Sequence, residues 1–124
     1  MKILNLTLHS VTAEQREAGV FDVKDVDKEQ LVKLLTFETL DVCSTHEIKA
    51  RATQIVALAL KYRAEAAMIG GALWLIAPLA KALRKHGIKP LFAFSKRESV
   101  ETTDGNGNVV KRSIFKHLGF VEYC

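Results

Sequence analysis

Residues 66–94 read AAMIGGALWLIAPLAKALRKHGIKPLFAF, and this stretch decides the fold class. The apolar run 66–69 is short enough for a buried strand, and residues 73–86 place apolar side chains at helical spacing. Gly87 follows as the glycine that closes this helix, and residues 90–94 supply a second strand. Strand, helix and strand in this order predict two parallel strands joined by a right-handed crossover.

The chain before this unit adds another strand and further helices. Residues 2–8 alternate apolar and polar side chains, which predicts a strand. Thr12 and Gln15 match a capping box at the start of a short helix. Residues 45–62 repeat apolar side chains at helical spacing, which predicts a longer helix. Asp27 is predicted to cap the start of a helix between these two.

The C-terminal part of the chain predicts a β-hairpin. Residues 98–101 and 109–115 flank Asp-Gly-Asn-Gly at 104–107, which is a strong turn signal, and residues 119–123 form a last strand. Together these elements predict an α/β fold. We expect a small, Rossmann-like, mainly parallel sheet flanked by helices, with the hairpin at one side.

Length and composition favour a single domain spanning residues 1–124. Hydrophobic residues make up 48% and charged residues 26% of the chain, which is typical of globular proteins and argues against disorder. The chain opens directly in a strand pattern without a signal-peptide core, and Cys43 and Cys124 form no motif spacing. We therefore expect a reduced, cytoplasmic protein without a disulfide framework or membrane association.

Charged residues are unevenly distributed along the chain. Six cations and no anion lie in residues 81–97, while acids concentrate between residues 14 and 47. This asymmetry favours an anionic partner for the C-terminal half. A solvated helix face explains the same pattern, and the sequence does not separate the two interpretations.

A glycine pair follows the predicted strand at 66–69. In mainly parallel sheets ligands bind beyond the carboxyl ends of the strands, so Gly70 and Gly71 are candidate ligand-binding residues. They allow the backbone to approach a ligand, and the helix behind them offers free N–H groups to an anion. The pair lacks a full dinucleotide-binding or Walker pattern, and a tight turn that eases helix packing explains it too.

Ser95, Lys96 and Arg97 follow the predicted strand at 90–94 and combine a hydroxyl group with two cations. Arginine binds phosphate through a two-pronged donor fork, and lysine acts as a mobile point charge. These residues are predicted to bind phosphate, and Lys96 is also a catalytic candidate. The alternative is a solvated strand end whose cations pair with nearby glutamates.

His9 and Ser10 follow the first predicted strand and are the other catalytic candidates. Histidine titrates near neutral pH and acts there as a general acid or base, although a loop histidine is more often a bystander. The cysteines and histidines show none of the spacings of metal sites, so neither a metal nor a cofactor is expected.

Two segments carry a family resemblance. The Ile3-Leu4-Asn5-Leu6 strand with the following His9-Ser10-Val11-Thr12-Ala13-Glu14-Gln15 stretch resembles the start of small CARF-like, CRISPR-associated proteins of the ring-nuclease kind. Residues 67–71 and 92–99 are also similar to uncharacterised phage and prophage proteins. The resemblance implies a Rossmann-like pocket, set across a homodimer, that binds a cyclic oligoadenylate messenger.

Such a pocket would cleave the messenger without a metal, by attack of a ribose 2′-hydroxyl on its own phosphate. The roles that follow are phosphate binding by Ser95, Lys96 and Arg97, backbone donation by Gly70 and Gly71, and orientation or deprotonation of the hydroxyl by His9 or Ser10.

A function of another class stays open. A phage-type accessory or anti-defence protein would bind a host protein or sequester a nucleotide without catalysis, and the lack of a complete catalytic constellation favours it. General nucleic-acid binding ranks below both interpretations, because few aromatic residues accompany the basic patch.

Overall fold

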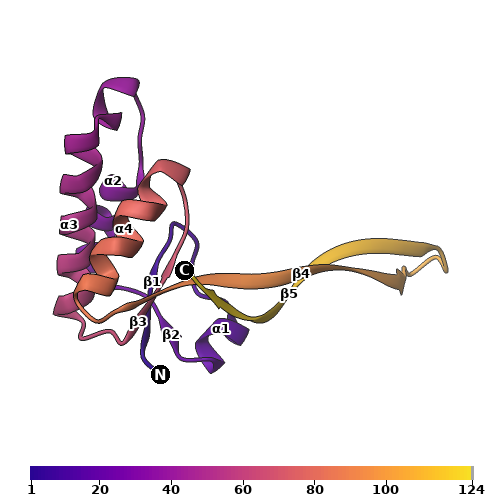
Figure 1. The fold of residues 1–124 in the computed structure, drawn as a ribbon. Coiled ribbons are helices and arrows are strands. Elements are labelled where there is room, and N and C mark those ends of the chain that lie inside the picture. The colour runs from indigo at the N-terminus through magenta and orange to yellow at the C-terminus, as the bar shows by residue number, and fades with distance from the viewer. Residues whose placement is uncertain (124) are drawn as a thin grey trace.

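The computed structural model describes residues 1–123 and shows an α/β fold with a mainly parallel sheet, helices and a C-terminal antiparallel hairpin, as the sequence predicts (Figure 1). The elements in chain order are β1 (Ile3–Leu6), α1 (Ala13–Glu17), β2 (Val20–Phe21), α2 (Asp25–Leu35), the 3₁₀ helix η1 (Leu40–Cys43), α3 (Thr45–Lys61), β3 (Ala66–Ile69), α4 (Leu73–Lys85), β4 (Lys89–Thr103) and β5 (Val109–Glu122).

The sheet has the strand order β2-β1-β3-β4-β5. The first four strands run parallel, and β5 pairs antiparallel with β4. From β1 the chain moves outward to β2, whereas from β3 it moves in the other direction to β4. The direction of winding therefore switches between β1 and β3, and in open α/β sheets such a switch point leaves a crevice at the carboxyl ends of the strands.

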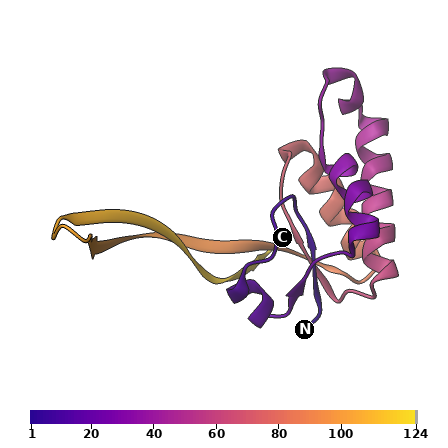
Figure 2. The same ribbon diagram turned by 180° about the vertical axis from the view of Figure 1, so that it is seen from behind.

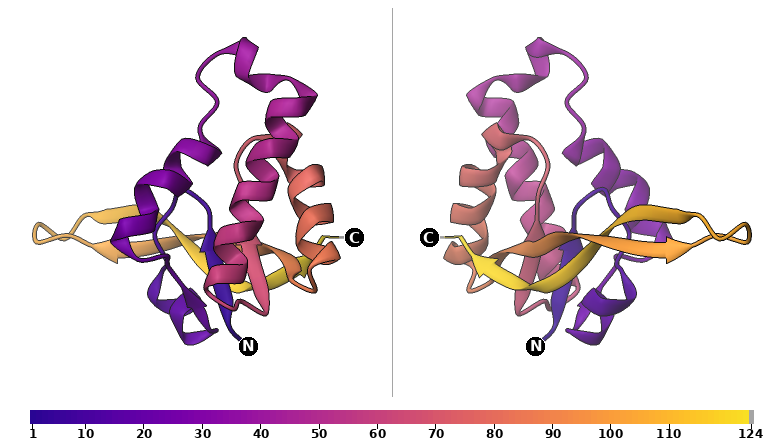
Figure 3. Two further views of the ribbon diagram at one scale, coloured as in Figure 1. Left: turned by 90° about the vertical axis from the view of Figure 1, so that its left-hand side faces the viewer. Right: turned by 90° about the vertical axis from the view of Figure 1, so that its right-hand side faces the viewer.

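The helices cover the two faces of the sheet unequally. Helices α2, α3 and α4 lie on one face, and the short helix α1 lies on the other, as the views in Figures 1, 2 and 3 agree. The main core fills the space between the sheet and the three helices, with Leu4, Leu6, Ile55 and Leu79 fully buried in it. A smaller second cluster lies on the face of the sheet that α1 covers. It contains Ile3, Val20, Ala66, Met68 and Leu91.

Two helices begin with a side-chain cap, and one of these caps is the predicted capping box. Thr12 Oγ1 accepts a hydrogen bond from the Gln15 amide at 3.1 Å, and the Gln15 side chain accepts one from the Thr12 amide, which completes the predicted capping box. Ser44 Oγ accepts from the amide of Glu47 at 3.1 Å, and α3 follows directly. Such caps supply partners for helical N–H groups that otherwise have none.

The predicted cap at Asp27 is wrong, because α2 begins two residues earlier. Asp27 lies inside the first turn and is buried, at 6% exposure. Its carboxylate accepts hydrogen bonds from the Lys61 amino group at 2.9 and 3.0 Å and from the Tyr62 hydroxyl. Asp27 therefore joins the start of α2 to the end of α3 and leaves the helix N-terminus without a side-chain cap.

The predicted C-terminal strands are also revised. The segments expected at 90–94 and 98–101 are one continuous strand, β4, and those at 109–115 and 119–123 are one strand, β5. The turn at 104–107 stands where it was predicted, with Asp104 Oδ1 accepting from the amides of Asn106 and Asn108. No glycine or proline interrupts residues 91–103, so nothing in the backbone ends the strand there.

The long hairpin leaves the body of the protein. Strand β4 pairs with β3 only from Lys89 to Leu91, and beyond that point its sole partner in the sheet is β5. A register shift between Phe94 and Ser95 leaves Leu118 as an extra residue in β5. Such bulges bend a strand and increase its twist. Residues 95–117, called the arm below, project away from the helices in Figures 1 and 2.

Two further findings concern the described part of the chain. No helix in residues 1–123 is long and apolar enough to cross a membrane. Cys43 is half-buried with a free thiol, whereas Cys124, which entered the disulfide prediction, lies outside the described residues.

The Asp27 contacts predict a pH-dependent contribution to stability. Hydrogen bonds from Tyr62 and then from Lys61 lower the pKa of Asp27 from its ordinary value of 3.8, because they favour the charged carboxylate. A lowered pKa in the folded state stabilises the fold above the unfolded-state pKa, and this stability is lost as the pH falls through the folded-state pKa.

We therefore expect Asp27→Asn to lower the melting temperature at neutral pH. This gap in melting temperature between the variant and the unmodified protein should narrow below about pH 4. Thermal unfolding followed by circular dichroism across this range measures the gap. Asp25→Asn, at an exposed position of the same helical turn, is the matched control. A gap of constant size from about pH 7 to about pH 3 would contradict the proposed role of the carboxylate.

Candidate functional site

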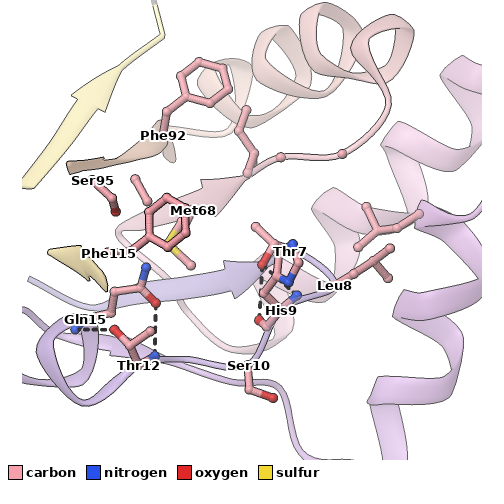
Figure 4. A pocket seen from close by; sticks show the side chains of 15 residues that line it. Thr7, Leu8, His9, Ser10, Thr12, Gln15, Met68, Phe92, Ser95 and Phe115 are labelled. Atoms are coloured by element: carbon pink, nitrogen blue, oxygen red, sulfur yellow. Dashed lines mark hydrogen bonds between the residues drawn. The ribbon is translucent and has the colours of Figure 1, made fainter. Parts of the chain in front are cut away.

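A cavity of about 730 Å³ opens at the carboxyl ends of β1 and β3, beside the first part of β4 (Figure 4). Its walls come from the loop between β1 and α1, the end of β3 with the glycine pair, and the first part of β4. The base of the arm closes a further side through Phe115 of β5. This is the edge at which the winding of the sheet switches direction, so the cavity occupies the position where ligands bind in open α/β sheets.

The structure brings five of the predicted site residues together. His9, Ser10, Gly70, Gly71 and Ser95 all line the cavity, although they come from three separate segments of the chain. In Figure 4 the Ser10 side chain points away from the Met68 and Phe115 side chains. The functional role of these residues stays a prediction, whereas their shared location is a property of the fold.

Lys96 and Arg97 lie outside the lining of the cavity. They are not at a strand end, as the sequence suggested, but inside the long strand β4. Successive residues of a strand face opposite sides, so Ser95 and Arg97 share one face and Lys96 lies on the other. The three residues therefore do not form one phosphate-binding cluster.

Arg97 nonetheless remains close to the cavity. Its guanidinium carbon lies 5.1 Å from the centre of the Phe115 ring, which it faces across the strand pair. Phe115 itself lines the cavity and is 67% exposed. Arg97 thus places a permanent positive charge behind an aromatic wall of the cavity, where Lys96 cannot reach from the opposite face of the hairpin.

The glycine pair has a clear geometric requirement at one position. Gly71 has a φ of +101°, a conformation that residues with a Cβ atom rarely adopt. Gly70 has an ordinary backbone, and a Cβ atom there would lie 3.5 Å from Thr7 Cγ2, which is normal van der Waals contact. The backbone turn therefore accounts for Gly71, whereas the space at Gly70 does not require a glycine.

A buried asparagine that the sequence reasoning missed holds the β1 side of the cavity. Asn5 is 2% exposed, and its amide group donates to the backbone oxygen of His9 at 2.6 Å and to Asp22 Oδ1 at 2.8 Å. Its side-chain oxygen accepts from the amide and the hydroxyl of Thr7 at 3.0 and 2.7 Å. Asp22 Oδ2 also accepts from the amide of Val11 at 3.4 Å.

All four hydrogen-bonding positions of the Asn5 side chain are thus satisfied. A buried polar network that is fully satisfied makes a loop rigid, so Asn5 sets the path of residues 7–11 along the cavity. The signal in the sequence was the polar Asn5 inside the otherwise apolar strand at 3–6. Because residues 2–8 alternate apolar and polar side chains, the strand pattern accounted for Asn5 without a buried network.

The chemistry of the cavity is mainly apolar. Leu8, Met68, Phe92 and Phe115 give it aliphatic and aromatic walls, and the polar groups stand along the β1 side. Phe115 was also missed, because it lies far along the chain from Gly70, in a hairpin that the sequence placed at the side of the sheet. Within residues 1–123 the His9 ring makes no hydrogen bond that would orient it as a general base.

Replacement of Asn5 by leucine tests the network. The substitution removes four hydrogen bonds and leaves Asp22 and the His9 carbonyl oxygen without this partner, so we expect a loss of about 2–4 kcal/mol in the free energy of unfolding. Hydrogen exchange should rise first at residues 7–11. Gln54→Leu, at an exposed position of α3, is the control for an added leucine. Unchanged exchange in the loop would show that Asn5 does not hold it.

Comparison with known proteins places the chain in a family without assigning an activity. No curated protein and no solved structure matches it. In residues 1–123 no group of three or more histidine, cysteine, aspartate or glutamate side chains is arranged to hold a metal ion. The model of the family described as "Uncharacterized protein MJ1673 family" matches residues 1–121, so the chain belongs to that family.

Proposed function

We propose that the cavity binds a nucleotide, with cyclic oligoadenylate as the first candidate ligand, in a Rossmann-like pocket at the switch point of the sheet. The observation that carries the proposal is the convergence of the ends of β1 and β3 and the first part of β4 on one cavity of about 730 Å³. This volume lies within the range of typical small-molecule sites, and such sites combine apolar walls with a few polar groups.

The two parts of a nucleotide match two parts of the cavity. A planar base packs favourably against aromatic and apolar side chains, which Phe115 and Met68 provide. A phosphate group prefers backbone N–H donors and cations. The Gly70–Gly71 turn supplies the donors at the cavity wall, and Arg97, beside Phe115 and outside the lining, adds a positive charge close to the cavity. The ligand therefore lies with its base toward the hairpin and its phosphate toward the glycine turn.

Cleavage of a cyclic ligand would use groups on the β1 side. The ribose 2′-oxygen attacks the adjacent phosphorus, the bond to the 5′-oxygen breaks, and a 2′,3′-cyclic phosphate forms. His9 accepts the proton of the 2′-hydroxyl as general base, and the 5′-oxygen takes a proton from water. Ser10 would have to turn toward the cavity to take part, given its direction in Figure 4.

Binding without turnover is the second candidate, and one observation favours it. The His9 ring has no hydrogen-bonding partner within the described residues to fix its tautomer or direction. Catalytic histidines are usually oriented by such a partner. A protein that sequesters a nucleotide needs only the cavity and not an oriented base.

Binding is tested by thermal-shift screening and calorimetry with cyclic oligoadenylates, linear oligoadenylates and AMP. A ligand that binds the folded state raises the melting temperature. Turnover is followed by chromatography of the cyclic ligand with and without a chelator. Binding without product identifies a sequestering protein, and product in the presence of chelator identifies the metal-free enzyme. Neither binding nor product across the panel removes the proposal.

Arg97 and Lys96 form a matched pair for locating the phosphate. Arg97→Gln removes the cation beside Phe115, and we expect the affinity for the nucleotide to fall about threefold to tenfold, because this charge acts on the phosphate at short range although Arg97 does not line the cavity. Lys96→Gln makes the same type of change on the opposite face of the hairpin and should leave the affinity within about twofold. Equal losses of affinity in both variants would mean that the two cations act on the nucleotide only through long-range electrostatics.

A further inference from the structure

The arm, residues 95–117, is the part of the fold that this chain alone does not explain. Its residues are exposed except for Glu98, Val100 and His117, which are half-buried. Two-stranded hairpins are at best marginally stable in water, and long exposed edge strands are normally covered or shortened. Four large apolar side chains of the arm are exposed, namely Val109, Val110, Ile114 and Phe115.

We propose that the arm is a dimerisation element, on which the arm of a second copy of this chain packs in antiparallel orientation. The contact uses the face opposite the cavity, called the free face below. It consists of four cross-strand rows from the base of the arm toward its tip: Lys96 with Lys116, Glu98 with Ile114, Val100 with Arg112, and Thr102 with Val110.

The free face contains a conflict within one copy. Lys96 and Lys116 are directly opposite each other across the strand pair, and like charges in this position destabilise a hairpin. The turn at the other end of the arm carries Asp104. When two arms pack antiparallel, the turn of each lies near the base of the other, so that the Asp104 of one copy approaches the two lysines of the other.

The middle of the free face is complementary to itself. Glu98 and Arg112 stand on opposite strands in neighbouring rows, and so do Ile114 and Val100. A two-fold axis that passes between these rows stacks each strand on its own copy, so that Glu98 of one copy lies diagonally across from Arg112 of the other, and Ile114 lies diagonally across from Val100. Such self-complementarity is what a two-fold interface requires. A parallel arrangement would instead place lysines against lysines.

The available area sets the strength of the contact. Residues 95–103 extend about 30 Å at about 3.4 Å per residue, and two strands with their side chains offer roughly 400 Å² on one face. A standard interface buries about 800 Å² on each partner, so the dimer is reversible and depends on protein concentration. Because the cavity lies on the other face of the hairpin, this proposal does not rest on nucleotide binding.

Sedimentation velocity of the full chain over a wide concentration series tests the dimer. We expect a reversible monomer–dimer equilibrium that Ile114→Glu shifts at least about tenfold toward monomer, since it removes the apolar contact with Val100 of the second copy and adds a second negative charge to the row of Glu98. Val26→Glu makes the same type of change at an apolar residue that is 79% exposed on α2, and it should leave the equilibrium unchanged. A protein that stays monomeric up to its solubility limit overturns the proposal and leaves the arm to a different partner.

A mixing experiment separates contacts between copies from contacts within one arm. Glu98→Arg and Arg112→Glu should each weaken self-association, because each variant meets its own copy with like charges. Mixed together, the two variants should associate again. The introduced arginine of one copy then faces the introduced glutamate of the other, and the unchanged Arg112 of the first copy faces the unchanged Glu98 of the second. Within a single arm the like charges remain in both variants. Failure of the mixture to associate, while the unmodified protein does, overturns the antiparallel arrangement.

Discussion

The pairing of β1 with β3 is the constraint on which the rest of the structure depends. Each strand has only four residues, and the side chains of both strands are all buried, because helices cover one face and α1 with the hairpin base covers the other. Strands so short and so completely buried leave no freedom of register. The same pairing fixes the switch in winding direction, and the cavity opens where these two strands end.

The sequence predicted the body of the fold because local signals and tertiary packing agree there. The strand at 66–69, the helix after the glycine pair and the capping box at Thr12 each have a local physical cause, and each stands in the structure. Asp27 shows where this fails. An acidic residue before an apolar helix is typical of a cap, but burial against Lys61 and Tyr62, distant in the chain, decided its role.

The candidate site was predictable only in part for a similar reason. The rule that ligands bind at strand ends led to His9, Gly70 and Ser95, and the fold does bring them to one cavity. It failed for Lys96, because residues 90–94 and 98–101 were predicted as two strands, although no glycine or proline interrupts residues 91–103 and β4 continues well past the edge of the body. Phe115 and Asn5 escaped notice because their importance depends on contacts with distant segments, which neither periodicity nor spacing records.

The hairpin connects the two proposals physically. Its cavity face supplies Ser95 and Phe115 to the pocket, and its free face carries the rows proposed to meet a second copy. Because side chains alternate along each strand, one hairpin serves both sites without sharing a residue between them. The sites are still linked, since a partner that fixes the twist of the arm also fixes where Phe115 and Arg97 lie. If both proposals hold, binding at either site changes the affinity of the other by the same factor.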